Sequence, residues 1–228
     1  MKRDKERFDH LIKNLERTSV KNSIFNYKSG EKAFLLLGQG NIKKWLETLL
    51  PNTRLIVEPK IIGSLISIQY IEGNLNKAIN KHSLDITNEV KSLSIIPKSL
   101  PIKERIEIQG VLYIDKNQSN THKNTEFLKL DLNPKERKRI KFCAFQIFNC
   151  KINHYQVLKQ LKNLKFEIPQ THLTKCISDI YIFHECWKQG KLFQNYPTSG
   201  IVLKINSRKL QKLLGENNLS IHWAYAIN

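Results

Sequence analysis

Apolar and polar positions alternate along several stretches of the chain, and this period of two predicts β-strands. The clearest stretch covers residues 54–79, in which Glu72-Gly73-Asn74 marks a turn between two strands. Shorter stretches predict strands at 105–114, 140–148 and 200–205. A chain with this many strands and turn signals is expected to be built mainly around β-sheet.

Helical spacing of apolar residues separates these strands. Residues 41–50 predict an amphipathic helix with Asn41 as its cap and Pro51 as its stop. Further helices are expected at 86–93, 155–164 and 177–189. The sheets are therefore expected to be flanked by helices, as in an α+β protein.

The first 34 residues differ from the rest of the chain. They are rich in Lys, Asn and Arg, with Phe8, Leu11, Ile12 and Leu15 at helical spacing. We expect residues 1–34 to form a basic helical and polar arm. Residues 35–228 suit one compact domain, because 40% of the 228 residues are hydrophobic.

The segment Val57-Glu58-Pro59-Lys60-Ile61-Ile62-Gly63 resembles the nucleotidyl-transfer motif of NAD-dependent DNA ligases, Glu-Pro-Lys-x-Asp-Gly. In that family the lysine takes AMP from the cofactor. Segments that are similar to the family's other motifs follow in the family's order, at residues 63–79, 84–97, 106–113, 142–145, 196–206, 210–215 and 223–226. The resemblance covers about residues 35–228.

The resemblance implies a ligase-type nucleotidyltransferase (adenylation domain) fold, an α+β fold with antiparallel sheets and flanking helices around a groove. It makes Lys60 the candidate catalytic residue, and Glu58 and Lys204 candidate nucleotide-binding residues. From the residues alone, Lys204 alternates with the apolar Leu203 on a strand, and we interpret it as a phosphate or solvent contact. Gly63, Gly110 and Gly200 are interpreted as tight backbone positions.

The departures from the family fall on its charged positions. Ile62 and Ser199 replace aspartates, Gln109 and Val111 replace an arginine and a glutamate, and Asn228 stands where the family has lysine. A pentavalent phosphorus needs cationic donors, and usually a metal held by carboxylates. We therefore expect a catalytically degenerate member with no cofactor, and NAD and Mg²⁺ only if the chain is an active enzyme. Residues 1–34 also lack the family's Tyr-Tyr-x-x-Asp pattern, and we expect a protein without the family's downstream modules.

The charge is strongly positive, with 38 Lys and Arg against 20 Asp and Glu and a net charge of +18. Such a balance is typical of nucleic-acid binders, although the amino-acid drift of an AT-rich genome also produces a basic solvated surface. The cations cluster, which favours nucleic-acid contact. Candidate nucleic-acid-binding residues are Lys81, Lys129, Lys135, Arg137, Lys138, Arg139 and Lys141.

Other site types lack support in the sequence. The cysteines Cys143, Cys150, Cys176 and Cys186 have no zinc-site spacing and are interpreted as reduced thiols. His184-Glu185 lacks the second histidine of a zincin and is interpreted as helix surface. No apolar run reaches the ~18 residues of a membrane span, and the N-terminus is too polar for a secretory signal. We expect no membrane partner and a cytoplasmic protein of the bacterial cytosol or nucleoid.

Taken together, these patterns predict a DNA-binding accessory or scaffold protein that holds duplex or nicked DNA within a larger replication, repair or transcription assembly. Two alternatives stay open. One is an active DNA ligase or nucleotidyltransferase that forms a Lys60-AMP intermediate. The other is a protein-interaction module that docks a partner through its unused pocket.

Overall fold

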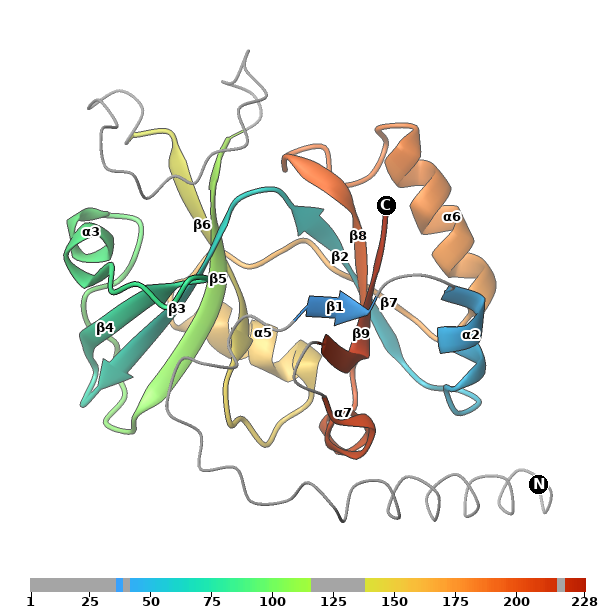
Figure 1. The fold of residues 1–228 in the computed structure, drawn as a ribbon, viewed down its shortest axis with the longest axis horizontal. Helices are drawn as coiled ribbons and strands as arrows, with labels where there is room; N and C mark the ends of the chain where they lie inside the picture. Colours follow the sequence, from blue (N-terminus) through green and yellow to red (C-terminus); the bar gives the residue numbers. More distant parts are fainter. Residues whose placement is uncertain (1–35, 39–41, 116–137, 217–219) are drawn as a thin grey trace.

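A computed structural model describes residues 36–38, 42–115, 138–216 and 220–228. These residues form two β-sheets with helices packed against them (Figure 1). The elements in chain order are β1 (Leu36–Gly38), α2 (Ile42–Glu47), β2 (Leu55–Ile61), β3 (Ser64–Ile71), β4 (Asn74–Asn80), α3 (Thr87–Ser92), β5 (Ile106–Ile114), β6 (Ile140–Ile147), α5 (His154–Asn163), β7 (His172–Thr174), α6 (Ile177–Lys188), β8 (Thr198–Ile205), α7 (Arg208–Leu214) and β9 (Ser220–Ile227).

The four-stranded sheet has the order β4-β3-β5-β6, and every pair in it is antiparallel. Strands β3 and β4 form a hairpin whose turn residues Glu72 and Gly73 have positive φ angles of 50° and 78°. This left-handed geometry matches the twist of the flanking strands and explains the glycine. One face of the sheet packs against α3 and α5 around a first core, which contains Ile66, Ile68, Tyr70, Ile108, Leu112, Phe142, Leu158 and Leu161.

The five-stranded sheet has the order β1-β9-β8-β2-β7, in which β1 and β9 are parallel and the other neighbours are antiparallel. Residues from α2 and α6 join it in a second core. This core also contains side chains from the other face of the four-stranded sheet, so it lies between the two sheets. Its members include Leu46, Val57, Ile180, Leu203, Ile205, Val111, Tyr113 and Cys143.

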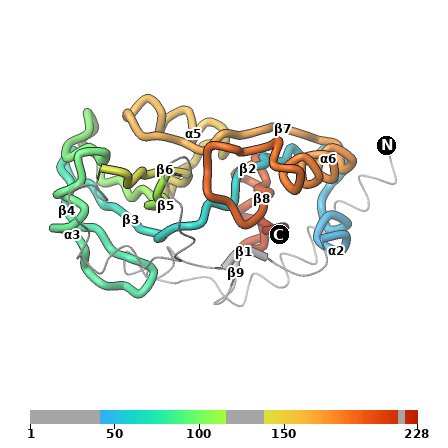
Figure 2. The backbone as a smooth tube through the Cα atoms, turned by 90° about the horizontal axis from the view of Figure 1, so that it is seen from above, coloured from blue at the N-terminus to red at the C-terminus, as the bar shows by residue number. Residues whose placement is uncertain are grey.

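The chain passes from the five-stranded to the four-stranded sheet between β2, which ends at Ile61, and β3 (Figure 2). Gly63 lies at this crossing, where a Cβ atom would collide with the carbonyl oxygen of Leu112. Gly110 and Gly200 are equally crowded, by the Phe142 ring and by the carbonyl oxygen of Ile227. The interpretation of these three glycines as tight backbone positions is confirmed.

The start of α5 is tied to the end of β8. The backbone N–H of His154 donates to the carbonyl of Asn206 at 2.9 Å, and the N–H of Tyr155 donates to the Asn206 side chain at 2.9 Å. Asn153 in turn accepts from the N–H of Arg208 at 3.0 Å. Helix α5 packs on β6 of the four-stranded sheet, so these bonds connect the two sheets and fix where His154 lies.

The α+β prediction is confirmed, and the predicted strands and most predicted helices lie within two residues of their observed bounds. The helix predicted over 41–50 is too long. In the structure α2 ends at Glu47, because the N–H groups of Thr48 and Leu49 bond three residues back and tighten the chain into turns before Pro51. The predicted arm at 1–34 lies outside the described residues. Within the described part of the chain, no helix has the length and apolar character that crossing a membrane requires.

Candidate functional site

Lys60 lies at the end of β2, partly exposed, where its ladder with β8 is irregular. Pro59 pairs with Ile201 and Ile61 pairs with Thr198, so two residues of β8 face Lys60 alone. Such a bulge turns side chains out of the regular pleat. Lys60 Nζ donates to Asn228 Oδ1 at 2.6 Å, across 168 residues of sequence. The lysine that resembles the ligase nucleophile is therefore held by a neutral amide.

Glu58 lies two residues earlier on β2 and is buried, with 3% of its surface exposed. Lys204 Nζ is 2.7 Å from Glu58 Oε2, and His154 Nε2 is 2.6 Å from Glu58 Oε1. Burial raises the pKa of the carboxyl, but Lys204 and His154 outweigh burial and lower the pKa of Glu58 to about 2. Glu58 is thus an anion whose two oxygens both have partners within the protein.

His154 is 1% exposed. Burial and the nearby Lys204 ammonium lower its pKa below the ordinary value for histidine, despite the opposite effect of Glu58. The ring is therefore neutral near pH 7 and donates through Nε2–H to Glu58. Its Nδ1 atom, the acceptor of the neutral ring, has no hydrogen-bond partner among the residues that the structure describes.

Lys204 also contacts the four-stranded sheet. Its Nζ lies 4.4 Å from the centroid of the Phe145 ring, a cation–π geometry. Phe145 is the extra residue of an irregularity in β6, where Gln109 pairs with Gln146 but Gly110 pairs with Ala144. Lys204 is 5% exposed, so its interpretation as a solvent contact is wrong. The reason is that Glu58 and Phe145 together solvate its ammonium.

The positions that differ from the ligase motif lie in varied surroundings. Ile62 is 42% exposed beside Lys60, and its N–H donates to the Pro197 carbonyl at 2.7 Å. Gln109 is buried between Ser67 and Gln146 across the sheet. Val111 belongs to the second core. The side chains at these sites now serve packing or face solvent as neutral groups.

The predicted cationic residues meet at one end of the four-stranded sheet. Ile66 pairs with Asn80, and Ile114 pairs with Ile140, so the end of β4, the starts of β3 and β6 and the end of β5 share that end. The cations placed there are Lys81 after β4, Lys138, Arg139 and Lys141 at the start of β6, and Lys60 before β3. Lys81 and Lys138 are exposed, and Arg139 and Lys141 are partly exposed. Lys129, Lys135 and Arg137 lie outside the described residues.

Sequence reasoning missed several members of this site. His154 reaches Glu58 from 96 residues away, and no local pattern signals that contact. His184, predicted to be helix surface, is half-buried and stacks on Trp187 with the ring centroids 5.7 Å apart. The Asn228 carbonyl 3.1 Å from His184 Nε2 explains its orientation.

The described residues contain few side chains that are placed for metal or thiol chemistry. No set of three or more His, Cys, Asp or Glu side chains is gathered there as a metal ion would need. The four cysteines are free.

Comparisons with known proteins agree with the geometry. Residues 31–136 match the family model of the NAD-dependent DNA ligase adenylation domain. A DNA ligase of Prochlorococcus marinus is 28% identical over 225 residues, covering 82% of this chain and 32% of the ligase. A DNA ligase of Buchnera aphidicola is 31% identical over 235 residues, covering 86% of this chain and 34% of the ligase. The chain thus spans about a third of the length of these curated relatives.

Solved structures show the same fold at low sequence identity. A Lig E DNA ligase structure, described as DNA binding with a minimal scaffold, matches with a TM-score of 0.50 and 17% identity over 77% of this chain and 62% of that one. The structure named Pmar-Lig_PreS3 matches with a TM-score of 0.51 and 11% identity over 93% of this chain and 49% of that one. The fold is the ligase nucleotidyltransferase fold, and the chain carries an adenylation domain of the NAD-dependent DNA ligase family.

Proposed function

We propose that this chain is a DNA-binding accessory or scaffold domain in which the adenylation pocket no longer supports adenylyl transfer. The observation that carries the proposal is the internal pairing of the pocket residues. Glu58 is bonded to Lys204 and His154, and Lys60 is bonded to Asn228. Each side chain that resembles a nucleotide-binding group therefore has a partner from the same chain.

The residues present do not fit an adenylate. A base that stacked on the Lys204 side of the Phe145 ring would have to displace the ammonium, which lies 4.4 Å from the ring centroid. It would also compete with His154 and Lys204 for the two oxygens of Glu58. Breaking a buried ion pair by removing one partner costs about 3–5 kcal/mol. This cost opposes nucleotide binding in the arrangement that the fold adopts.

The DNA-binding part of the proposal rests on charge and its placement. The net charge is +18, and Lys81, Lys138 and Lys141 share one end of the four-stranded sheet with Arg139. Phosphate contacts of this kind give affinity without sequence information and make binding strongly salt-dependent. The larger replication, repair or transcription assembly would then supply any chemistry.

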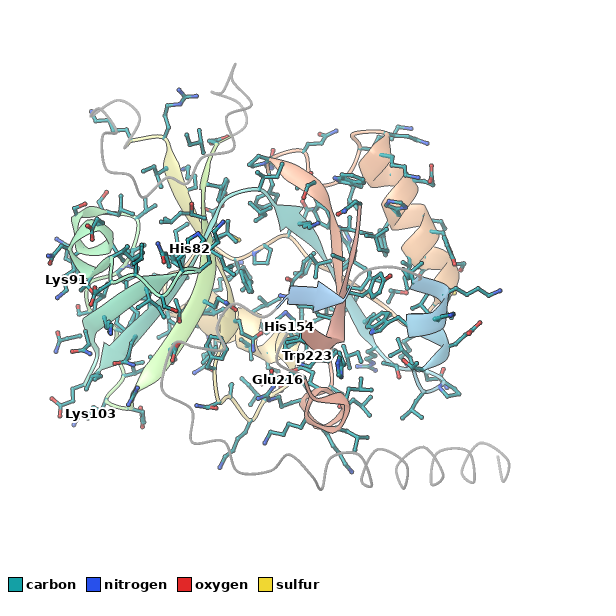
Figure 3. All side chains as sticks on the ribbon, viewed as in Figure 1. His82, Lys91, Lys103, His154, Glu216 and Trp223 are labelled. Carbon is teal, nitrogen blue, oxygen red and sulfur yellow. The ribbon has the colours of Figure 1, made fainter. Side chains whose placement is uncertain are left out.

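The DNA-binding proposal is tested by titrating the pure protein against nicked, intact and single-stranded DNA at two salt concentrations. We expect tight binding that weakens steeply with salt. In a Lys81→Ala, Lys138→Ala, Lys141→Ala protein the salt slope should fall by about one for each phosphate that these lysines neutralise. Lys103→Ala is the matched control, because Lys103 is an exposed lysine just before β5, at the opposite end of the same sheet (Figure 3). Equal losses of affinity in the two proteins, or no binding at low salt, would refute the proposed surface.

The loss of adenylyl transfer is tested with radiolabelled NAD and, separately, ATP in the presence of Mg²⁺. We expect no label on the protein after denaturing electrophoresis at neutral or alkaline pH, where the acid-labile P–N bond of a lysyl adenylate would survive. Covalent label that disappears in Lys60→Ala would show an active nucleotidyltransferase and overturn this half of the proposal. Label that persists in Lys60→Ala would come from another residue or a contaminant and would leave Lys60 without that role.

A further inference from the structure

Helix α6 carries an aromatic surface that the pocket does not use. Tyr181, His184 and Trp187 follow one another at three-residue spacing, which places them on neighbouring turns of one helix side. His184 and Trp187 are stacked with an interplanar angle of 8°. Tyr181 is 50% exposed, so the series runs from two half-buried rings to one that faces solvent.

The two stacked rings are fixed by hydrogen bonds at their edges. Trp187 Nε1 donates to Thr198 Oγ1 at 2.8 Å, and His184 Nε2 lies 3.1 Å from the Asn228 carbonyl oxygen, which accepts from it. Rings held in this way lose little further freedom when a flat ligand packs against them. The surface is therefore more ordered than an exposed aromatic side chain usually is.

A cation lies next to this surface. Asn228 connects the aromatic surface of α6 to Lys60. Its carbonyl accepts from His184, and its side chain accepts from Lys60 Nζ at 2.6 Å. An ammonium has three donors, so this bond leaves others for a further acceptor. An aromatic ring beside a cation is the pairing that single-stranded nucleic-acid sites use, with bases stacked on rings and phosphates on cations.

The surrounding charge favours a polyanion over an apolar protein partner. The exposed Lys175 and Lys191 flank α6, and Lys188 at the end of the helix is paired with Glu185. The acids of the helix are already engaged: Asp179 accepts from Thr174 at 2.6 Å, and Glu185 accepts from Lys188 at 3.0 Å. Ile177 and Ile182, exposed by 50% and 59%, add apolar surface beside Tyr181 against which the flat face of a base can pack.

We propose that the side of α6 formed by Tyr181, His184 and Trp187, together with Lys60, binds unpaired nucleotides of a DNA strand. The bases stack on the rings and a phosphate meets the Lys60 ammonium. This inference rests on the proposed DNA-binding function and adds a second contact, for single-stranded ends or gaps beside the duplex. The duplex is assigned to Lys81, Lys138, Arg139 and Lys141 at the end of the four-stranded sheet, and Lys60 is assigned to the unpaired strand.

The test compares three fluorescein-labelled probes at constant salt: oligothymidylate, an abasic strand of the same length, and a blunt duplex. We expect Tyr181→Ala to weaken oligothymidylate binding by about tenfold, since stacking on one aromatic side chain is typically worth that much. Binding of the abasic strand and the duplex should change less than about twofold. Tyr181→Phe, which keeps the ring, should behave like the unaltered protein.

Tyr155→Ala is the matched control, because Tyr155 is a 36% exposed tyrosine on α5 with Lys159 Nζ 4.9 Å from its ring centroid. Equal effects of the Tyr181 and Tyr155 substitutions would overturn the proposal. So would a Tyr181→Ala effect that is the same for the abasic strand, because it would report charge or folding and not stacking. Failure of the duplex to bind would instead count against the proposed function, while the comparison of the two single strands would still decide this inference.

Discussion

Lys204→Met is the substitution that tests the buried ion pair most directly. It removes the ammonium that lies 2.7 Å from Glu58 Oε2 but keeps an unbranched side chain of similar length against Phe145. Of the two partners of Glu58, only His154 then remains. Leaving a buried charge without its partner costs about 3–5 kcal/mol, and we expect the free energy of unfolding near pH 7 to fall by that amount.

The same ion pair also predicts how the free energy of unfolding changes with pH. In the unaltered protein the pKa of Glu58 is lowered from 4.5 to about 2. Because each pKa unit corresponds to ~1.4 kcal/mol, this carboxylate contributes roughly 3 kcal/mol. A lowered carboxyl pKa gives stability that is present above pH 4.5 and is lost as the pH falls from 4.5 toward 2. The lowered pKa of His154 acts in the same direction, because below its ordinary value of 6.5 the unfolded chain binds the proton more readily.

In Lys204→Met the shift in the pKa of Glu58 reverses its direction. Without the ammonium, burial dominates and raises the pKa of Glu58, so the folded state takes up a proton more readily than the unfolded chain. The stability difference between the two proteins should therefore shrink as the pH falls from about 7 to about 4. Urea denaturation at a series of pH values measures this difference, provided that the slope against urea is the same for both proteins.

The control is the double variant Lys204→Met, Glu58→Gln, in which no buried charge remains. It should recover most of the stability at neutral pH, because replacing both members of a buried pair is often nearly neutral. A Lys204→Met protein that is destabilised by less than about 1 kcal/mol, or a double variant no more stable than the single one, would refute the electrostatic reasoning. The cost would then belong to packing.

Three further substitutions test other features of the fold. Gly200→Ala should lower the free energy of unfolding, measured by urea denaturation, by more than about 2 kcal/mol, because Gly200 has a φ of 150° and an added Cβ would collide with a carbonyl oxygen. Gly190→Ala is the control and should cost only about 1 kcal/mol, because Gly190 has a φ of 67° and nothing lies within 4 Å of the added Cβ. Asn206→Ala should remove one bond to the start of α5, and amide hydrogen exchange should quicken in the first turn of that helix; unchanged exchange there would mean that Asn206 does not hold the helix in place. Phe145→Leu should lower the free energy of unfolding by about 1–2 kcal/mol more when Lys204 is present than when it is replaced by Met, which a double-mutant cycle with Lys204→Met measures. A coupling energy of zero would show that the cation–π contact adds no stability.

Local patterns predicted most of the sheets. The alternate positions of β3 that the sequence predicts to be apolar face the first core, where Ile66, Ile68 and Tyr70 are fully buried. Strands β1 and β7 could not be predicted in the same way, because three residues are too few to show a period of two. Their existence depends on pairing with β9 and β2, which is a property of the assembled sheet.

The candidate site was predictable only as far as single positions resemble a motif. Glu58, Lys60 and Lys204 stand at matching positions, and the structure places them on two adjacent strands, β2 and β8. Their partners were not predictable. His154 and Asn228 are brought in by the tie between α5 and β8 and by the end of β9, and neither tie leaves a pattern in the local sequence.

The internal pairing also changes what the retained residues imply. Glu58 and Lys204 could be interpreted as signs of adenylyl transfer, because they match the ligase motifs. In this structure each neutralises the other in a buried setting, so a chain that lost one of them and kept the other would be less stable whatever its activity. Their retention is therefore explained by folding alone. Lys60 has no such role, since it is partly exposed and bonded to a neutral amide. Lys60→Ala should leave the free energy of unfolding within about 0.5 kcal/mol of the unaltered value. The presence of Glu58 and Lys204 therefore does not decide whether the pocket still performs chemistry, and the covalent labelling of Lys60 does.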